Sequence, residues 1–122
     1  MINLLFHPNS FKLYLLVCLL VIEFLATTTI HIEAIESFWD KGNHFAAFFV
    51  LYILLSFAYE NLTLYIKIAL LLGFGLQIEI VQSFIDGRFF SLLDVVADSI
   101  GIAIGVFFYK YLRKFLLYLT SR

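Results

Sequence analysis

Charge and chain-breaking residues are both scarce in this sequence. Of its 122 residues 14% are charged, and it contains one proline and one cysteine. A single cysteine, Cys18, excludes an intrachain disulfide, and the chain has no Gly-, Ser- or Pro-rich linker that would separate two domains. With a formal net charge of −1 and no basic stripe interleaved with aromatics, the composition argues against a nucleic-acid partner. We therefore expect one domain over residues 1–122.

Apolar residues make up the rest of the chain, at 63% of its length. A soluble domain of this size could not bury so much apolar surface, which points to lipid as the solvent. Four segments are long enough, or nearly so, to cross a hydrocarbon core that needs roughly 20 residues. They span about residues 11–30, 43–59, 64–85 and 92–111. We predict an all-α integral membrane bundle of four transmembrane helices, multi-pass in a bacterial cytoplasmic membrane, with self-association left open.

The cationic residues predict the orientation of this bundle, because Lys and Arg collect on the cytoplasmic side. The expected outer side carries Lys41 and Arg88, in the loops 31–43 and 86–91. The expected inner side carries Lys12, Lys67, Lys110, Arg113, Lys114 and Arg122. Both termini should thus be cytoplasmic, with residues 110–122 as a frayed end of the fourth helix at the membrane surface.

Polar side chains within the apolar segments fall in the half that this topology places in the outer leaflet. They are Glu23, His44, Glu79, Gln82, Asp94 and Asp98. An acid at the centre of a membrane helix costs about 2.5–3.5 kcal/mol, and such residues mark functional sites. Either the acids pair with Arg88, Lys41 or His44, or some are protonated through desolvation and mutual repulsion. We expect them to form one polar site within roughly 10 Å of the outer surface.

Helical spacing places these residues on defined faces. Gly75, Glu79 and Gln82 share one face of the third segment, and Asp94, Asp98, Gly101 and Gly105 share one face of the fourth. The three glycines predict close helix packing beneath the acids. Arg88 lies in the short turn between the two segments, where its guanidinium is expected to pair with a carboxylate.

These motifs together resemble the VanZ-like family of small membrane proteins, which is named for a teicoplanin-resistance protein. The resemblance covers about residues 38 to 108 and rests on Asp40-Lys41-Gly42-Asn43-His44, Glu79-Ile80-Val81-Gln82, Gly87-Arg88, Ser91, and Asp94-Val95-Val96-Ala97-Asp98 followed by Gly101 and Gly105. Asp98 departs from the family, which usually has Asn there, and Asp86 stands where a proline is common. The resemblance implies an integral envelope protein, linked in some members to glycopeptide susceptibility, with no established reaction.

Three classes of function fit the predicted site. The favoured one is a pocket for a lipid-linked or anionic headgroup, in which Arg88 and Lys41 hold the anion and the other ligand-binding candidates are Asp40, Gln82, Asp98, Ser91 and Glu23. The second is an intramembrane enzyme acting on an envelope lipid, with Glu79 or Asp94 as general base and His44 as acid. The third, a proton-coupled transporter using Glu23, fits least because the acids lie in one leaflet.

A cation-binding variant of the second class would use Glu79, Asp94, Asp98 and His44 as ligands, an oxygen-rich set that favours a hard ion. The sequence contains no recognised metal-ligand spacing and no nucleophile motif. We therefore expect no metal and no cofactor, and membrane lipid as the partner.

Overall fold

The computed structural model describes residues 6–27, 41–84 and 92–120, with the backbone alone for residues 25–27, 41–43 and 120. The described residues form four α-helices and contain no strand. The helices are α2 (Pro8–Thr27), α4 (Lys41–Ala58), α5 (Leu64–Gln82) and α6 (Leu92–Thr120). The predicted all-α fold with four helical segments is confirmed.

Several helix boundaries differ from the predicted ones, and two of the differences have local reasons. Helix α2 begins at Pro8, where a proline is favoured because the first helical N–H has no partner in the helix. The Nδ1 atom of His7 accepts a hydrogen bond from the backbone N–H of Asn9 at 3.1 Å and so caps this start. Helix α5 ends at Gln82 rather than residue 85, because the Ser83 hydroxyl donates to the Ile80 carbonyl oxygen at 2.6 Å and closes the last turn.

The C-terminal part of the chain is helical, so the prediction of a frayed end is wrong. Helix α6 continues to Thr120. The sequence after Gly105 contains no proline or glycine that would end the helix. One ion pair also ties this part of α6 to the turn after α4, since Arg113 Nε lies 3.9 Å from Glu60 Oε1.

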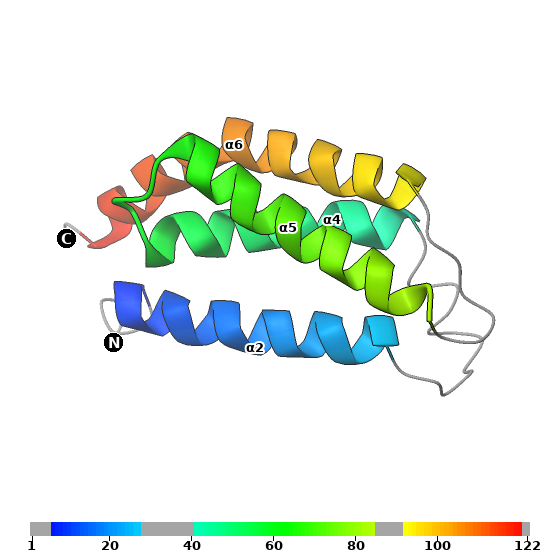
Figure 1. Ribbon diagram of the computed structural model, residues 1–122. Helices are drawn as coiled ribbons and strands as arrows, with labels where there is room; N and C mark the ends of the chain where they lie inside the picture. The colour runs from blue at the N-terminus through cyan, green and yellow to red at the C-terminus, as the bar shows by residue number, and fades with distance from the viewer. Residues whose placement is uncertain (1–5, 28–40, 85–91, 121–122) are drawn as a thin grey trace.

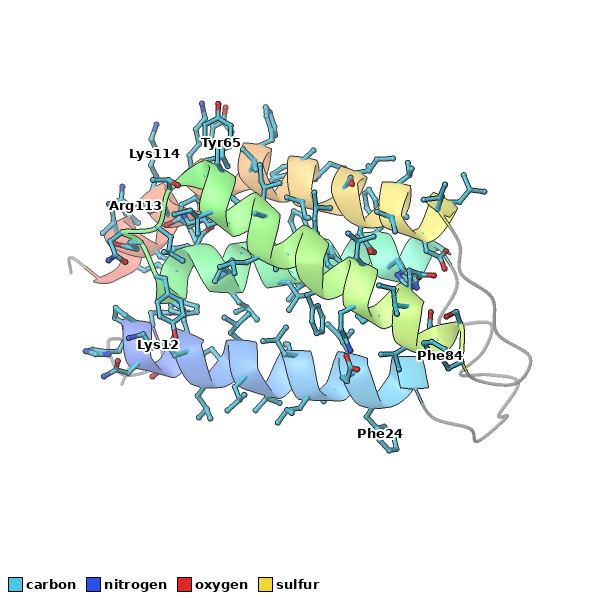
Figure 2. All side chains as sticks on the ribbon, viewed as in Figure 1. Lys12, Phe24, Tyr65, Phe84, Arg113 and Lys114 are labelled. Carbon is cyan, nitrogen blue, oxygen red and sulfur yellow. The ribbon has the colours of Figure 1, made fainter. Side chains whose placement is uncertain are left out.

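The four helices run alternately up and down (Figure 1). Helices α4 and α6 begin at the end of the bundle where α2 and α5 finish, and we name this the acidic end because it holds the acids discussed below. The opposite end, where α2 begins and α6 finishes, is the basic end. Lys12, Arg113 and Lys114 lie there, together with Tyr65 (Figure 2). The described Lys and Arg side chains thus lie toward the basic end, where Glu60 is the one described acid, and the other described acids lie toward the acidic end.

Helix α4 contacts the other three helices and packs most extensively against α6. Its side chains Phe48 and Leu51 are fully buried, as is Ile78 of α5. Close packing between α4 and α6 depends on Gly101, because a Cβ atom there would overlap the backbone carbonyl oxygen of Phe45. A Cβ at Gly105 would lie 3.0 Å from the side chain of Tyr52, so the two backbones stay close over more than one turn.

Two of the described helical stretches, Leu64–Gln82 and Leu92–Leu119, are long and apolar enough to cross a membrane. The stretch His44–Ala58 of α4 is apolar but shorter. On α2, apolar side chains that are half or more exposed recur at helical spacing: Leu13, Leu16, Val17, Leu20, Val21 and Phe24. The two spans are identified by length and composition alone. Together with the exposed apolar side chains of α2, they agree with a bundle whose outer surface is apolar.

The contact at Gly101 leads to a prediction with a matched control. We expect Gly101→Ala to destabilise the protein by about 1–3 kcal/mol, because the new methyl group meets backbone atoms that cannot rotate away. Gly73→Ala is the control, since a Cβ there meets nothing within 4 Å and alanine raises helix propensity. Thermal unfolding in detergent, followed by circular dichroism, measures both. Equal stability of the two variants would contradict the close approach of α4 and α6.

Candidate functional site

The centre of the site is a buried contact between His44 and Asp98. His44 lies in the first turn of α4 and is 2% exposed, while Asp98 lies in the second turn of α6 and is 1% exposed. The Nδ1 atom of His44 is 3.1 Å from Asp98 Oδ1, a hydrogen-bond distance. Because both side chains are removed from solvent, this bond satisfies groups that would be costly to bury alone.

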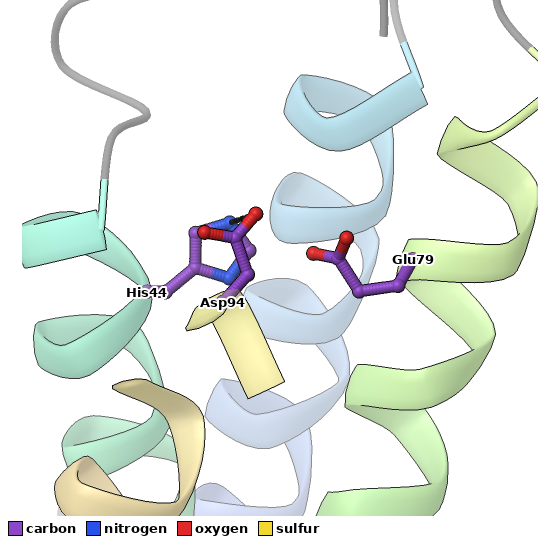
Figure 3. A group of neighbouring side chains, drawn as sticks. All are labelled: His44, Glu79 and Asp94. Carbon is purple, nitrogen blue, oxygen red and sulfur yellow. Dashed lines mark ion pairs between the residues drawn. The ribbon is translucent and has the colours of Figure 1, made fainter. Parts of the chain in front are cut away.

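Two more carboxylates approach the same imidazole from different helices. Asp94, one turn before Asp98 in α6, has Oδ2 at 3.9 Å from His44 Nε2. Glu79, from the last turns of α5, is fully buried and points toward the other two side chains (Figure 3). One ligand-type atom from each of His44, Glu79 and Asp94 lies within 4.8 Å of the others. Three helices therefore converge on one small volume.

Gly75 makes room for this arrangement from α5. A Cβ atom on Gly75 would lie 2.6 Å from Asp98 Oδ2 and 3.2 Å from the ring of Phe48. Gly75 and Glu79 lie on one face of α5, as predicted. Gly75 lies against Asp98, and Glu79 lies one turn closer to the acidic end. Gln82, one turn further on, is also buried.

Glu23 of α2 has a partner that the sequence did not indicate. Its Oε1 atom accepts a hydrogen bond from Nε2 of Gln77 at 2.8 Å, which ties α2 to α5. Gln77 lies two residues before Glu79 and so points to another side of α5. Glu23 is therefore held near the acidic end through a contact separate from the His44–Asp98 pair.

Four predicted site residues cannot be placed. Asp40, Arg88 and Ser91 lie outside the described residues, and so does the side chain of Lys41, the first residue of α4. The expected pairing of Arg88 with an acid is therefore not tested.

A second polar cluster at the basic end was missed by the sequence reasoning. Lys67 is only 6% exposed, and its Nζ atom lies over the rings of Tyr109 and Tyr52, at 5.2 and 5.8 Å from their centroids. The Tyr109 hydroxyl donates to the backbone carbonyl of Ser56 at 3.3 Å. The distribution of Lys and Arg places Lys67 at the membrane interface. The signal for its burial was Tyr52, a tyrosine in the middle of the second predicted segment, because an aromatic ring can contact a cation.

The chemistry available at the acidic end follows from its donor and acceptor atoms. Carboxylates accept hydrogen bonds from hydroxyl and ammonium groups, and imidazole either donates or accepts. Within a low-dielectric bundle these interactions are stronger than in water, and an unpaired group is correspondingly costly. The cluster is therefore suited to hold a polar or cationic group presented from the acidic end.

The comparisons with known proteins bear on this geometry. A family model described as VanZ/LLP1 matches residues 5–116, a range that includes every described residue of the site. This match confirms the resemblance noted from the sequence motifs. Neither the curated proteins nor the solved structures contain a match.

The His44–Asp98 bond predicts different effects for two substitutions of Asp98. We expect Asp98→Ala to destabilise the protein by about 1–3 kcal/mol, because it leaves a buried imidazole N–H without its acceptor. Asp98→Asn should cost much less, since the amide oxygen still accepts that hydrogen bond. Thermal unfolding in detergent compares the two variants, and equal losses would show that His44 does not depend on this acceptor.

Proposed function

Because the chain belongs to the VanZ/LLP1 family, we propose that it is an integral membrane protein of the bacterial envelope that binds a lipid headgroup. In this proposal all four helices cross the cytoplasmic membrane, and both termini are cytoplasmic. The acidic end lies in the outer leaflet and holds the polar part of a lipid or lipid-linked ligand.

The distribution of apolar surface supports four crossings rather than two. Helices α5 and α6 qualify by length and composition, and α4 packs against both of them and against α2. The exposed apolar stripe of α2, defined above, faces away from these neighbours. A stripe of that length on a soluble protein would be an unpartnered hydrophobic patch, whereas in a bilayer it faces lipid.

The separation of charge supports the orientation. The described cations of the basic end are Lys12, Lys67, Lys110, Arg113 and Lys114. Lys and Arg beside short loops favour the cytoplasmic side, while Asp and Glu have little influence on orientation. The same rule then directs the acidic end outward.

The convergence of His44, Glu79, Asp94 and Asp98 is the observation that carries the ligand-binding proposal. Buried ionisable groups that meet inside a membrane bundle indicate a functional site, because scaffold alone does not require them. Their oxygen and nitrogen atoms suit the hydroxyl and amine groups of a headgroup. Lys41 begins α4 three residues before His44, and Arg88 precedes α6, so both are proposed to neutralise its phosphate.

The resemblance noted from the motifs links some VanZ-like members to glycopeptide susceptibility, and an envelope ligand of this type is compatible with that link. We propose on this basis that the chain affects susceptibility to teicoplanin.

Lipid retention tests the proposed ligand. Native mass spectrometry of the detergent-purified protein should show bound lipid, and Arg88→Ala and Glu79→Gln should each reduce the bound fraction about tenfold or more. The reason is that each removes a charge-assisted hydrogen bond worth about 1.5–3 kcal/mol. Lys12→Ala, at the basic end, is the control and should retain lipid. Equal retention in all three variants would refute the proposed site, and unchanged teicoplanin susceptibility on expression would refute the cellular role.

Cysteine labelling tests the proposed orientation. In a Cys18→Ser background, Ser91→Cys should react with a membrane-impermeant maleimide added to intact spheroplasts, because residues 86–91 are proposed to face outward. Ser121→Cys, next to the C-terminus, should react only after the membrane is opened. The reverse pattern would invert the topology and move the acidic end to the cytoplasm.

A further inference from the structure

The geometry points to a divalent metal ion bound between α4, α5 and α6 by His44, Glu79 and Asp94. We propose a transition-metal ion that accepts mixed imidazole and carboxylate ligands, with Zn²⁺ as the probe. This differs from the sequence-based expectation of no metal. It deepens the proposed headgroup site, although binding of the ion itself does not require that a lipid is bound.

The three ligands come from three helices and face one another (Figure 3). Their ligand-type atoms lie within 4.8 Å of one another, and His44 Nε2 is 3.9 Å from Asp94 Oδ2. Ligands bound to one Zn²⁺ at about 2.0–2.2 Å in tetrahedral geometry lie about 3.4 Å apart. The cluster therefore needs to close by about 1 Å, a shift within reach of rotation about the Glu79 side-chain bonds.

Asp98 prepares His44 for this role. A metal-bound histidine donates its other ring N–H to a carboxylate or carbonyl, which fixes the ring and directs the free nitrogen at the ion. Here Asp98 Oδ1 is 3.1 Å from Nδ1. In the neutral tautomer that donates Nδ1–H to this carboxylate, Nε2 carries the lone pair that a metal ion binds. Nε2 is the atom that faces Asp94. Asp98 is thus a positioning residue behind the ligand.

The balance of charge and hydrogen bonds also favours a cation. Among the side chains that the structure describes, three carboxylates surround one imidazole, and two of them, Glu79 and Asp98, are at most 1% exposed. Asp98 Oδ2 is buried and has no hydrogen-bond donor among the residues that the structure describes. Negative charges at such spacing repel one another strongly in a low-dielectric interior. A divalent ion offsets this repulsion at the point where the carboxylates meet.

The site also has an entrance and an open position. The Asp94 side chain is 19% exposed, so the proposed entry of the ion is past this residue. Three protein ligands leave a fourth position of a tetrahedral ion open. A phosphate oxygen of a headgroup would fill that position, which makes an anionic ligand compatible with an acid-rich pocket.

Zn²⁺ binding by the full chain tests this inference. Detergent-purified protein without a histidine tag is treated with a chelator, and Zn²⁺ affinity is measured by competition with a chromophoric indicator. We expect one equivalent to bind, and His44→Ala, Glu79→Gln and Asp94→Asn each to weaken binding at least tenfold. Asp98→Asn should weaken Zn²⁺ binding by no more than about 100-fold, as expected for a residue that orients a ligand.

The controls remove the same residue types elsewhere. His7→Ala removes an exposed histidine before α2, and Glu60→Gln removes an exposed acid at the basic end, so both should bind Zn²⁺ as the unmodified protein does. Circular dichroism and monodisperse elution establish that each variant is folded. Loss of binding confined to the site variants confirms the metal site, whether or not lipid is retained. Equal affinity in folded site and control variants overturns it, again independently of lipid retention.

Discussion

The backbone contact between Gly101 of α6 and Phe45 of α4 is the constraint on which the site depends. Gly101 lies one turn after Asp98, and Phe45 directly follows His44. When these two backbones meet, the neighbouring side chains of α4 and α6 are brought within hydrogen-bond distance of each other. A side chain at Gly101 would overlap the Phe45 backbone and force α4 and α6 apart at this point. The glycine therefore positions the ionisable groups without taking part in their chemistry.

Gly75 of α5 also makes close packing around the site possible, because it has no side chain. The Asp98 carboxylate occupies the volume that a side chain at this position of α5 would fill. Burial of Asp98 thus depends on two glycines, one on its own helix and one on α5. The polar site and the tight packing beneath it form one structural unit, which explains why acids and glycines share the same helical faces.

The sequence alone predicted which acids and glycines share a helical face, because periodicity is a property of each helix by itself. The spacing of Glu79 with Gly75, and of Asp98 with Gly101, assigned each pair to one face, and the order of cationic residues predicted which helix ends meet. The family was also predicted from its motifs and is confirmed by the match to residues 5–116.

The side-chain contacts between helices could not be predicted in the same way. These contacts depend on how each helix is rotated about its own axis relative to its neighbours. A helix that is apolar on nearly every side does not indicate in its sequence which side faces a neighbour. The hydrogen bond between Glu23 and Gln77 and the burial of Lys67 both depend on that rotation. The ends of α5 and α6 were missed for a different reason, since a serine closing a turn and the absence of a helix breaker are weak local signals.

The two ends of the bundle satisfy buried charge by different means, and this difference bears on function. At the basic end Lys67 lies against the faces of Tyr52 and Tyr109, so its charge is accommodated by aromatic rings. At the acidic end the carboxylates gather around a single imidazole, so hydrogen bonding and ionic contact take the place of aromatic rings.

The buried residues between the two ends are apolar for several helical turns. They include Phe48, Leu51, Leu71 and Ile102. A proton crossing the bundle would need a chain of titratable groups or water through this layer, and the described core residues there offer aliphatic and aromatic side chains instead. An apolar layer of described residues thus separates the acidic cluster from the basic end. This separation supports the proposal of a headgroup site over that of a proton-coupled transporter.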